Sequence, residues 1–374
     1  MSVDADERIA FVLQADLHLL GPDQREWLDR LDQERQALEG LLEQLIALRD
    51  TDRALVLAGA LSRFWWMRGY ARAGRERLER VLQLRGGASA ARAGALVGAG
   101  SLAYALGDFC QARSFYDETV ALWQASGREL ELADALDRAG MAARQLMLLE
   151  DAYRYHTQAL AIQRRLGTSA AQALCLNNLG VVAFFQGDLG IARAYHHEAL
   201  ALREQCGDVR GKASSLNNLG QVSRFAGELA TALTYLEEGL ALRQHLSDRW
   251  GVSGSHVNLA VVHAGLRNLE RARHHLREAL AGFAAVEDPL GICECLEAAA
   301  ELAHTDGGLD DAVAFWTAAA TRRESLSAPL APLHQRVMSE RLAELRAALS
   351  PEMYATARQR GQQIDHLLTS LVKE

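Results

Sequence analysis

Two histidine pairs and one cysteine pair are the residues whose types could bind a metal ion. They are His196–His197, His274–His275, and Cys293 with Cys295. Zinc needs ligands that converge at about 2.0–2.3 Å. Adjacent residues on a helix point about 100° apart, so the members of each histidine pair diverge. We therefore expect no metal site, and nothing else in the sequence indicates a bound cofactor.

Two segments come closest to a phosphate-binding loop, which needs the pattern G-x-x-x-x-G-K-[ST] between a strand and a helix. CGDVRGKA (206–213) lacks the first glycine, and GYARAGRE (69–76) has Arg75 in place of the lysine. No set of Ser, His, Asp or Cys residues at catalytic spacing can be assembled either. The sequence therefore predicts a protein that binds and does not catalyse.

Paired asparagines recur at Asn177–Asn178 and Asn217–Asn218, and Asn258 continues the second column. Each side chain carries one acceptor oxygen and one donor NH₂ group. A row of them can therefore pair with the backbone amides of an extended ligand, whatever the side chains of that ligand are. The same groups could instead bond to neighbouring helices and hold the helices in register. The sequence leaves both interpretations open.

A repeat of 40 residues positions these asparagines. Small residues mark its register at Gly100, Gly140, Gly180, Gly220, Ala260 and Ala300. Two helices of one hairpin approach closely only where neither carries a bulky side chain, so each repeat predicts a helical hairpin. A glycine near the turn, as at Gly187 and Gly227, supplies the positive φ that ends the first helix.

The same repeat accounts for the histidines in another way. One position of the repeat is occupied in turn by Tyr116, His156, His196, Leu236, Leu276 and Trp316. Large residues of such different chemistry share only their ability to fill the space between helices, which pack about 8–10 Å apart. This series therefore predicts packing, not metal binding.

Composition narrows the class of protein further. Lys and Arg number 40 against 48 acidic residues, a formal charge of −8, which argues against nucleic-acid and anionic-membrane surfaces. Five prolines and abundant helix formers predict helix nearly throughout, and no run of eighteen apolar residues could span a bilayer. Five scattered cysteines and an acidic N-terminus without an apolar segment indicate a cytoplasmic protein.

The pattern L-G/A-x(12)-A-x(6)-A resembles the tetratricopeptide repeat, lengthened to 40 residues. Repeats of this length resemble those of kinesin light chains, of the bacterial maltose-regulon activator and of actinobacterial signal-transduction ATPases. The likeness to the ATPases extends beyond the repeats. Residues 21–45 and 60–82 resemble the helices that follow their nucleotide-binding domain, and residues 295–335 and 340–364 resemble their closing repeat and C-terminal helices.

The resemblance implies that the first helices of the hairpins line a concave groove for an extended peptide or a partner's helix. The candidate groove residues are Arg144, Asn177, Asn178, Phe184, Phe185, Asn217, Asn218, Gln221, Arg224, Phe225 and Asn258. The asparagines would clamp the ligand backbone, similar to the asparagine ladders of kinesin light chains, and the arginines would attract carboxylates. The phenylalanines would form either apolar pockets or part of the core.

These observations predict an all-α, right-handed α-solenoid of about seven tetratricopeptide-like hairpins. We expect capping helices at 1–50, the solenoid at 51–325 and further capping helices at 326–374. Within the run Phe64–Trp66, at least one ring must point away from the buried face, where it could seat a partner or lie under the capping helix 23–48.

The expected function is a non-catalytic scaffold that binds a protein or peptide in bacterial signal transduction or transcriptional regulation. The chain could be free-standing or part of a longer regulator. The alternative is the small-molecule sensor domain of a regulatory ATPase whose ATPase and DNA-binding parts are absent from this chain. A deep pocket lined by Phe184, Phe185, Arg224 and Phe225 would favour that alternative, whereas an open groove along the asparagines would favour a peptide.

Overall fold

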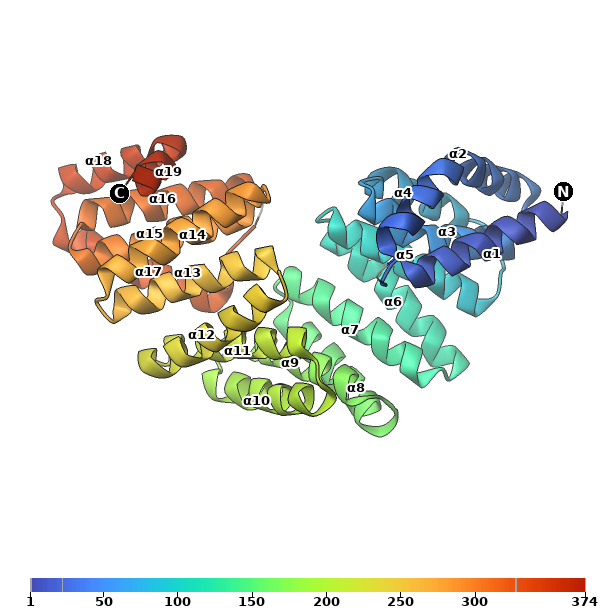
Figure 1. Cartoon of the computed structure of the whole chain (residues 1–374), viewed down its shortest axis with the longest axis horizontal. Coiled ribbons are helices and arrows are strands. Elements are labelled where there is room, and N and C mark those ends of the chain that lie inside the picture. Colours follow the sequence, from blue (N-terminus) through green and yellow to red (C-terminus); the bar gives the residue numbers. More distant parts are fainter. Residues whose placement is uncertain (1, 22, 327, 374) are drawn as a thin grey trace. The chain divides into compact units, whose positions relative to one another are not determined.

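A computed structural model describes residues 2–21, 23–326 and 328–373. These residues form nineteen helices and no strand, so the chain is an all-α solenoid of consecutive helical hairpins, as predicted (Figure 1). Contacts between Cα atoms divide it into an N-terminal unit that ends at Gly167 and a C-terminal unit that begins at Thr168. The boundaries predicted at residues 50 and 325 divide capping helices from repeats. The division at Gly167 is of another kind and does not test them, so they stay predictions.

The N-terminal unit has two leading helices followed by three hairpins, α3–α4, α5–α6 and α7–α8. Its helices are α1 (Ser2–His18), α2 (Gln24–Leu48), α3 (Thr51–Met67), α4 (Ala71–Leu82), α5 (Ser89–Ala105), α6 (Phe109–Ser126), α7 (Glu129–Gln145) and α8 (Leu149–Leu166). Phe64 and Trp65 are buried in the core of this unit, whereas the Trp66 side chain is 57% exposed. The run of three aromatic residues is thus split between core and surface, as helical geometry requires.

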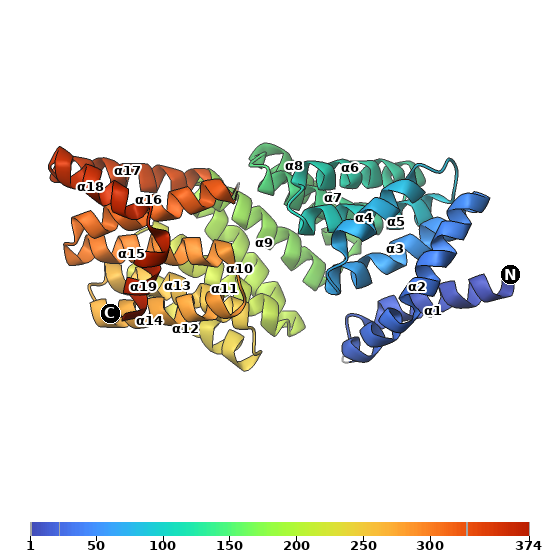
Figure 2. The same cartoon turned by 90° about the horizontal axis from the view of Figure 1, so that it is seen from above.

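The C-terminal unit has four hairpins followed by three helices. Its helices are α9 (Ser169–Gln186), α10 (Leu189–Cys206), α11 (Val209–Phe225), α12 (Leu229–His245), α13 (Arg249–Gly265), α14 (Leu269–Ala285), α15 (Pro289–Asp306), α16 (Leu309–Ser325), α17 (Pro332–Ala348), α18 (Pro351–Gly361) and α19 (Ile364–Lys373). After α16 the chain does not simply continue the stack. α17 returns to contact α9, the first helix of the unit (Figure 2).

The turns within the hairpins follow the predicted glycine rule. Gly187 and Gly227 have φ values of 92° and 80°, in the left-handed region that ends a helix without steric cost for glycine. At the equivalent turns, Met147 and Arg267 take the same conformation at 57° and 59°. The turn geometry is therefore a property of the repeat, and glycine is its less strained occupant.

The close contact inside each hairpin is also as predicted. A Cβ on Gly180 would lie 2.6–2.8 Å from ring atoms of His196, and a Cβ on Gly140 would lie 2.7–2.9 Å from the ring of His156. At the next repeat, the side chain of Leu236 fills the same place over Gly220. This position of the second helix packs directly on the small residue of the first, whichever large side chain it carries.

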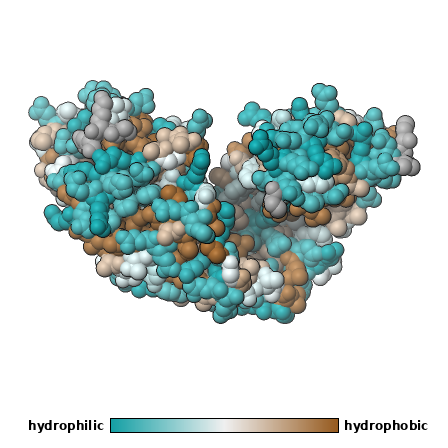
Figure 3. Space-filling view, viewed as in Figure 1, coloured by the Kyte–Doolittle hydropathy of each residue, from teal (hydrophilic) through white to brown (hydrophobic). Residues whose placement is uncertain are grey.

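The surface fits this arrangement. On the face shown in Figure 3, hydrophilic residues cover most of both units, with smaller hydrophobic patches interspersed. No helix in the described ranges is long and apolar enough to cross a membrane.

We expect Gly180→Ala to lower the free energy of unfolding by about 1–3 kcal/mol, because the added methyl group collides with the buried imidazole of His196. Gly254→Ala is the matched control, since nothing lies within 4 Å of a Cβ at that helical glycine. The control should gain about 0.5–1 kcal/mol from the better helix former. Urea unfolding measures both; equal effects at the two sites would contradict the close contact.

Burial lowers the pKa of His196 to about 3, so the folded chain holds this imidazole neutral while the unfolded chain protonates it below about pH 6.5. Stability from this residue is therefore complete above pH 6.5 and is lost as the pH falls toward 3. His196→Leu, which copies Leu236, should change the free energy of unfolding at pH 7 by no more than about 1 kcal/mol. Below pH 6.5, the variant should become more stable than the unchanged protein by at most about 1.4 kcal/mol per pH unit. Parallel pH profiles from thermal unfolding would refute this.

Candidate functional site

The predicted asparagines lie on one side of α9, α11 and α13, which we call the first-helix face. We define it by Asn177, Phe184, Asn217, Phe225 and Asn258. All five belong to the C-terminal unit. Asn178, Asn218 and Gln221 are half-buried on the same helices.

Arg144, another predicted residue, lies on α7 of the N-terminal unit. Burial lowers the pKa of its guanidinium. The candidate site therefore comprises residues of the C-terminal unit.

A buried arginine links the first two hairpins of this unit. Nη1 of Arg203, on α10, donates to Oδ1 of Asn177 at 3.2 Å within its own hairpin. The same atom donates across to α11, to the carbonyl oxygen of Gly211 at 2.8 Å and to Oγ of Ser215 at 2.6 Å. A buried guanidinium without acceptors would be very costly, so these bonds hold the two hairpins in one register.

The same set of bonds recurs 40 residues later. Nη1 of Arg243 donates to the Gly251 carbonyl at 2.7 Å, to Oγ of Ser255 at 2.8 Å and, at the limit of hydrogen-bond length, to Oδ1 of Asn217 at 3.5 Å. The asparagines also bond to one another along the stack. Nδ2 of Asn218 donates to Oδ1 of Asn177, and Nδ2 of Asn258 donates to Oδ1 of Asn217, both at 3.1 Å.

At the third junction the whole set becomes apolar. The equivalent positions hold Val257, Phe283 and Cys295, which are 8%, 1% and 0% exposed. A Cβ on Gly291 would lie 2.2–2.5 Å from the Phe283 ring, so this glycine makes room for the larger residue. The last hairpin restores a polar pair, with Nε of Arg323 donating to Oε1 of Glu297 at 2.5 Å. These positions change together because a lone polar member would be left buried without a partner.

The asparagines use only half of their polar atoms in this way. The remaining atoms are Nδ2 of Asn177 and Asn217 and Oδ1 of Asn218 and Asn258, and none of them has a hydrogen-bond partner within the described part of the chain. None of them is among the buried atoms that lack a partner, so all four reach solvent. One polar atom of each of these side chains therefore bonds between helices, and the other is left for a ligand. The sequence had left these two uses open as alternatives.

The phenylalanines, for which the sequence left open either apolar pockets or a place in the core, pack against residues of α17. Phe184 and Phe225 meet edge to face at 5.1 Å, and the ring of His334, on α17, lies 5.6 Å from the first and 4.9 Å from the second. Leu333 is buried in the same cluster, and Phe185 packs against it. The first turn of α17 thus lies at the place where a deep pocket would have favoured a small-molecule ligand.

Arg224 lies at the edge of this aromatic cluster. Its guanidinium is 4.2 Å from the centre of the Phe225 ring, and its Nε is buried without a hydrogen-bond partner in the described residues. Burial lowers the pKa of Arg224 to about 10, and the charges of Glu301 and Glu297 offset part of that effect. Burial, and then the charges of Arg224 and Arg323, lower the pKa of His334 to about 4, so this imidazole is neutral at pH 7.

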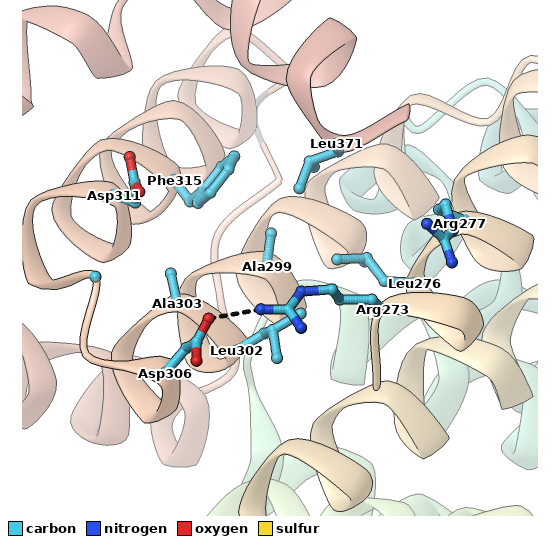
Figure 4. A pocket seen from close by; sticks show the side chains of 11 residues that line it. Arg273, Leu276, Arg277, Ala299, Leu302, Ala303, Asp306, Asp311, Phe315 and Leu371 are labelled. Atoms are coloured by element: carbon cyan, nitrogen blue, oxygen red, sulfur yellow. Dashed lines mark hydrogen bonds and ion pairs between the residues drawn. The ribbon is translucent and has the colours of Figure 1, made fainter. Parts of the chain in front are cut away.

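A pocket lies elsewhere in the C-terminal unit, between α14, α15 and α16 (Figure 4). It encloses about 100 Å³, its floor is apolar with Leu276, Leu302 and Phe315, and Leu371 of α19 closes one side. Arg273 at its rim is bound to Asp306 at 2.6 Å. None of the predicted groove residues lines this pocket.

The histidines that attracted a metal interpretation make other contacts. Nδ1 of His256 lies 2.8 Å from Nδ1 of His275, and the His275 ring stacks on that of His263 at 5.3 Å. Among the described residues, no group of three or more His, Cys, Asp or Glu side chains is placed to hold a metal ion.

Comparison with known families places this geometry in context. Models of the tetratricopeptide repeat match residues 131–205, 171–245 and 257–286. The chain therefore contains tetratricopeptide repeats in the region that carries the first-helix face. No curated protein sequence is a significant match.

Several solved structures resemble the chain over most of its length. A Rap protein complexed with competence and sporulation factor has a TM-score of 0.66 at 16% identity, covering 98% of this chain and 99% of that one. The Rap conjugation gene regulator of plasmid pLS20, in complex with the Phr* peptide, has a TM-score of 0.59 at 15% identity, covering 90% of this chain and 96% of that one. The apo form of the quorum sensor NprR from B. thuringiensis has a TM-score of 0.56 at 16% identity, covering 91% of this chain and 99% of that one. At these identities the likeness establishes the fold alone.

Two parts of this site were not predicted from the sequence. The junction arginines Arg203 and Arg243 could have been found, because they recur 40 residues apart and Arg323 continues the series. The return of α17 to α9 had no comparable signal, since no repeat relates the two segments.

We expect Arg243→Phe alone to cost about 2–4 kcal/mol, because it strands Asn217 and Ser255 at a buried junction. Adding Asn217→Val and Ser255→Cys copies the third junction and should recover at least half of that loss, since Gly251 already provides the space that Gly291 gives Phe283. Chemical denaturation of the single and triple variants measures the coupling. Additive losses would show that the junction residues do not act as a set.

Proposed function

We propose that the chain is a non-catalytic scaffold that binds a peptide, or an extended segment of a partner protein, along its first-helix face. The observation that carries the proposal is the row of solvent-reaching amide groups on Asn177, Asn217, Asn218 and Asn258. Both donors and acceptors are present in that row. It can therefore pair with the N–H and the C=O groups of a ligand backbone.

The spacing of the row suits an extended chain. Packed helices lie about 8–10 Å apart, and an extended peptide advances about 3.3–3.6 Å per residue. Asparagines on successive first helices would therefore meet about every third residue of the ligand. Because they are already fixed by the junction bonds, little side-chain entropy is lost on binding.

The comparisons support the proposal at the level of the fold. One Rap structure is described as a complex with the Phr* peptide, and that protein as a conjugation gene regulator. We propose by analogy that peptide binding here regulates a partner protein in the bacterial cytoplasm, in signal transduction or transcriptional control. The sequence resemblance to the helical region of actinobacterial signal-transduction ATPases points in the same direction. A small-molecule effector has less support, because α17 fills the place predicted for its pocket.

A double substitution separates the two roles of the asparagines. Asn177→Asp with Asn217→Asp keeps the oxygens that accept from Arg203 and Arg243 and removes both open donors. Asp137 occupies the equivalent position of α7, where its Oδ1 lies 2.8 Å from Nδ1 of His156. We expect this variant to melt within about 2 °C of the unchanged protein and to bind peptides at least 10-fold more weakly, a loss of about 1.4 kcal/mol.

The probes are peptides of 5–12 residues selected from a random displayed library against the unchanged full-length chain, with binding measured by fluorescence anisotropy. Asn177→Ala with Asn217→Ala is the comparison variant, and it should lower the melting temperature because two buried arginines lose acceptors. Unchanged affinity in the aspartate variant would exclude the asparagine row as the site. Failure to select any binding peptide would contradict the proposed function itself.

A further inference from the structure

α17 is attached to the rest of the C-terminal unit by two buried leucines and by the half-buried Met338 and Leu342, which pack against the core. Of its 17 residues only Leu333 and Leu345 are buried, whereas α15, with 18 residues, buries nine. Elements with little buried surface open at a small fraction of the global free energy of unfolding. α17 therefore combines a specific position with weak attachment.

The first turn of α17 docks on the aromatic cluster of the first-helix face. Leu333 is 5% exposed among Phe184, Val222 and Ala183, and His334 meets the rings of Phe184 and Phe225 edge to face. Further along α17, Nε of Arg341 lies 3.7 Å from Oε2 of Glu301 on α15. The helix thus contacts α9 and α11 through its first turn and reaches α15 through Arg341, so its first turn lies on two of the three helices that carry the asparagine row.

The fit between α17 and this surface is incomplete at Arg224. The guanidinium faces the aromatic rings with no carboxylate within ion-pair distance among the described residues, because Glu297 is bound to Arg323 and Glu301 to Arg341. α17 presents only the imidazole of His334 at this point. A carboxylate in that place would form a charge-assisted hydrogen bond with a largely desolvated partner.

We propose that the first two turns of α17 are a displaceable plug, and that the ligand of the first-helix face replaces it by placing an apolar side chain where Leu333 sits and a carboxylate on Arg224. This inference rests on the proposed function, because it specifies what regulates the same face. Docking of α17 and binding of the ligand then exclude each other. Because the plug is part of the same chain, it competes with a free ligand at an effective concentration in the millimolar range. The contact between the ligand carboxylate and Arg224 would give the ligand the additional affinity that it needs to displace the plug.

The test uses the full-length chain and a fluorescein-labelled peptide of residues 332–346, PLHQRVMSERLAELR, as the probe. Leu333→Asp should release the plug, and Ala347→Asp, an exposed position of the same helix, is the matched control. We expect the Leu333→Asp chain to bind the probe at least 10-fold more tightly than the unchanged chain or the control. Adding Phe225→Ala to Leu333→Asp should reverse that gain.

A second probe tests the role of Arg224. The peptide PLEQRVMSERLAELR carries Glu in place of His334 and should bind the Leu333→Asp chain several-fold more tightly than the first probe. Arg224→Gln in that chain should abolish the difference between the probes. Equal binding of the two probes before that substitution would overturn the assignment of a carboxylate site.

Hydrogen exchange in the same variants shows whether the fold survives. Fast exchange in α17 with protection retained in α9–α16 is the expected result. Loss of protection throughout, or a protected chain that does not bind the probe, would overturn the plug and make α17 an integral cap. Because the probe is the chain's own sequence, the result is independent of the library selection, so failure of the plug and failure of peptide binding are separable.

Discussion

Each guanidinium buried between two hairpins must find acceptors there, and the C-terminal unit is arranged around that requirement. Arg203 and Arg243 are 5% and 9% exposed, and each bonds to an asparagine on one side and to a carbonyl and a serine on the other. A shift of one hairpin against the next would break all of these bonds together. The asparagine oxygens are therefore fixed in place before any ligand arrives.

That constraint explains how one row of residues can serve both the stack and a ligand. An amide side chain has two ends, and the junction uses one end of each asparagine. The other end reaches solvent with its orientation already set by the bonded end. Ser215, by contrast, places its one polar atom at the buried junction with Arg203 and has no second polar atom that could reach solvent.

α17 packs on part of the first-helix face. Its first turn covers the phenylalanines but brings no carboxylate to Arg224, so the chain's own helix satisfies the apolar part of the surface and leaves the charge unpaired. Arg224 is half-buried, and its buried Nε gains no hydrogen bond to offset the loss of water. A ligand that brings a carboxylate to Arg224 would therefore fit this surface better than α17 does.

The repeat made most of the fold predictable from sequence. Small residues every 40 positions located the hairpins, and the series from Tyr116 to Trp316 identified the side chains that pack on them. The asparagines were found as polar residues on one helical face, but their division between stack and solvent depends on the rotamers of Arg203 and Arg243, which spacing does not determine. The position of α17 depends on a contact between residues 184 and 333, and no local pattern relates segments so far apart.

The most direct test of the central claim is hydrogen exchange of the four asparagine side-chain NH₂ groups by NMR, with each resonance assigned through its Asn→Asp variant. In the free chain, the NH₂ groups of Asn218 and Asn258 should exchange slowly, because they donate to Asn177 and Asn217. Those of Asn177 and Asn217 should exchange fast and become protected when a selected peptide binds. Equal exchange of all four in the free chain, or no change on peptide binding, would contradict the division of the asparagines between stack and ligand.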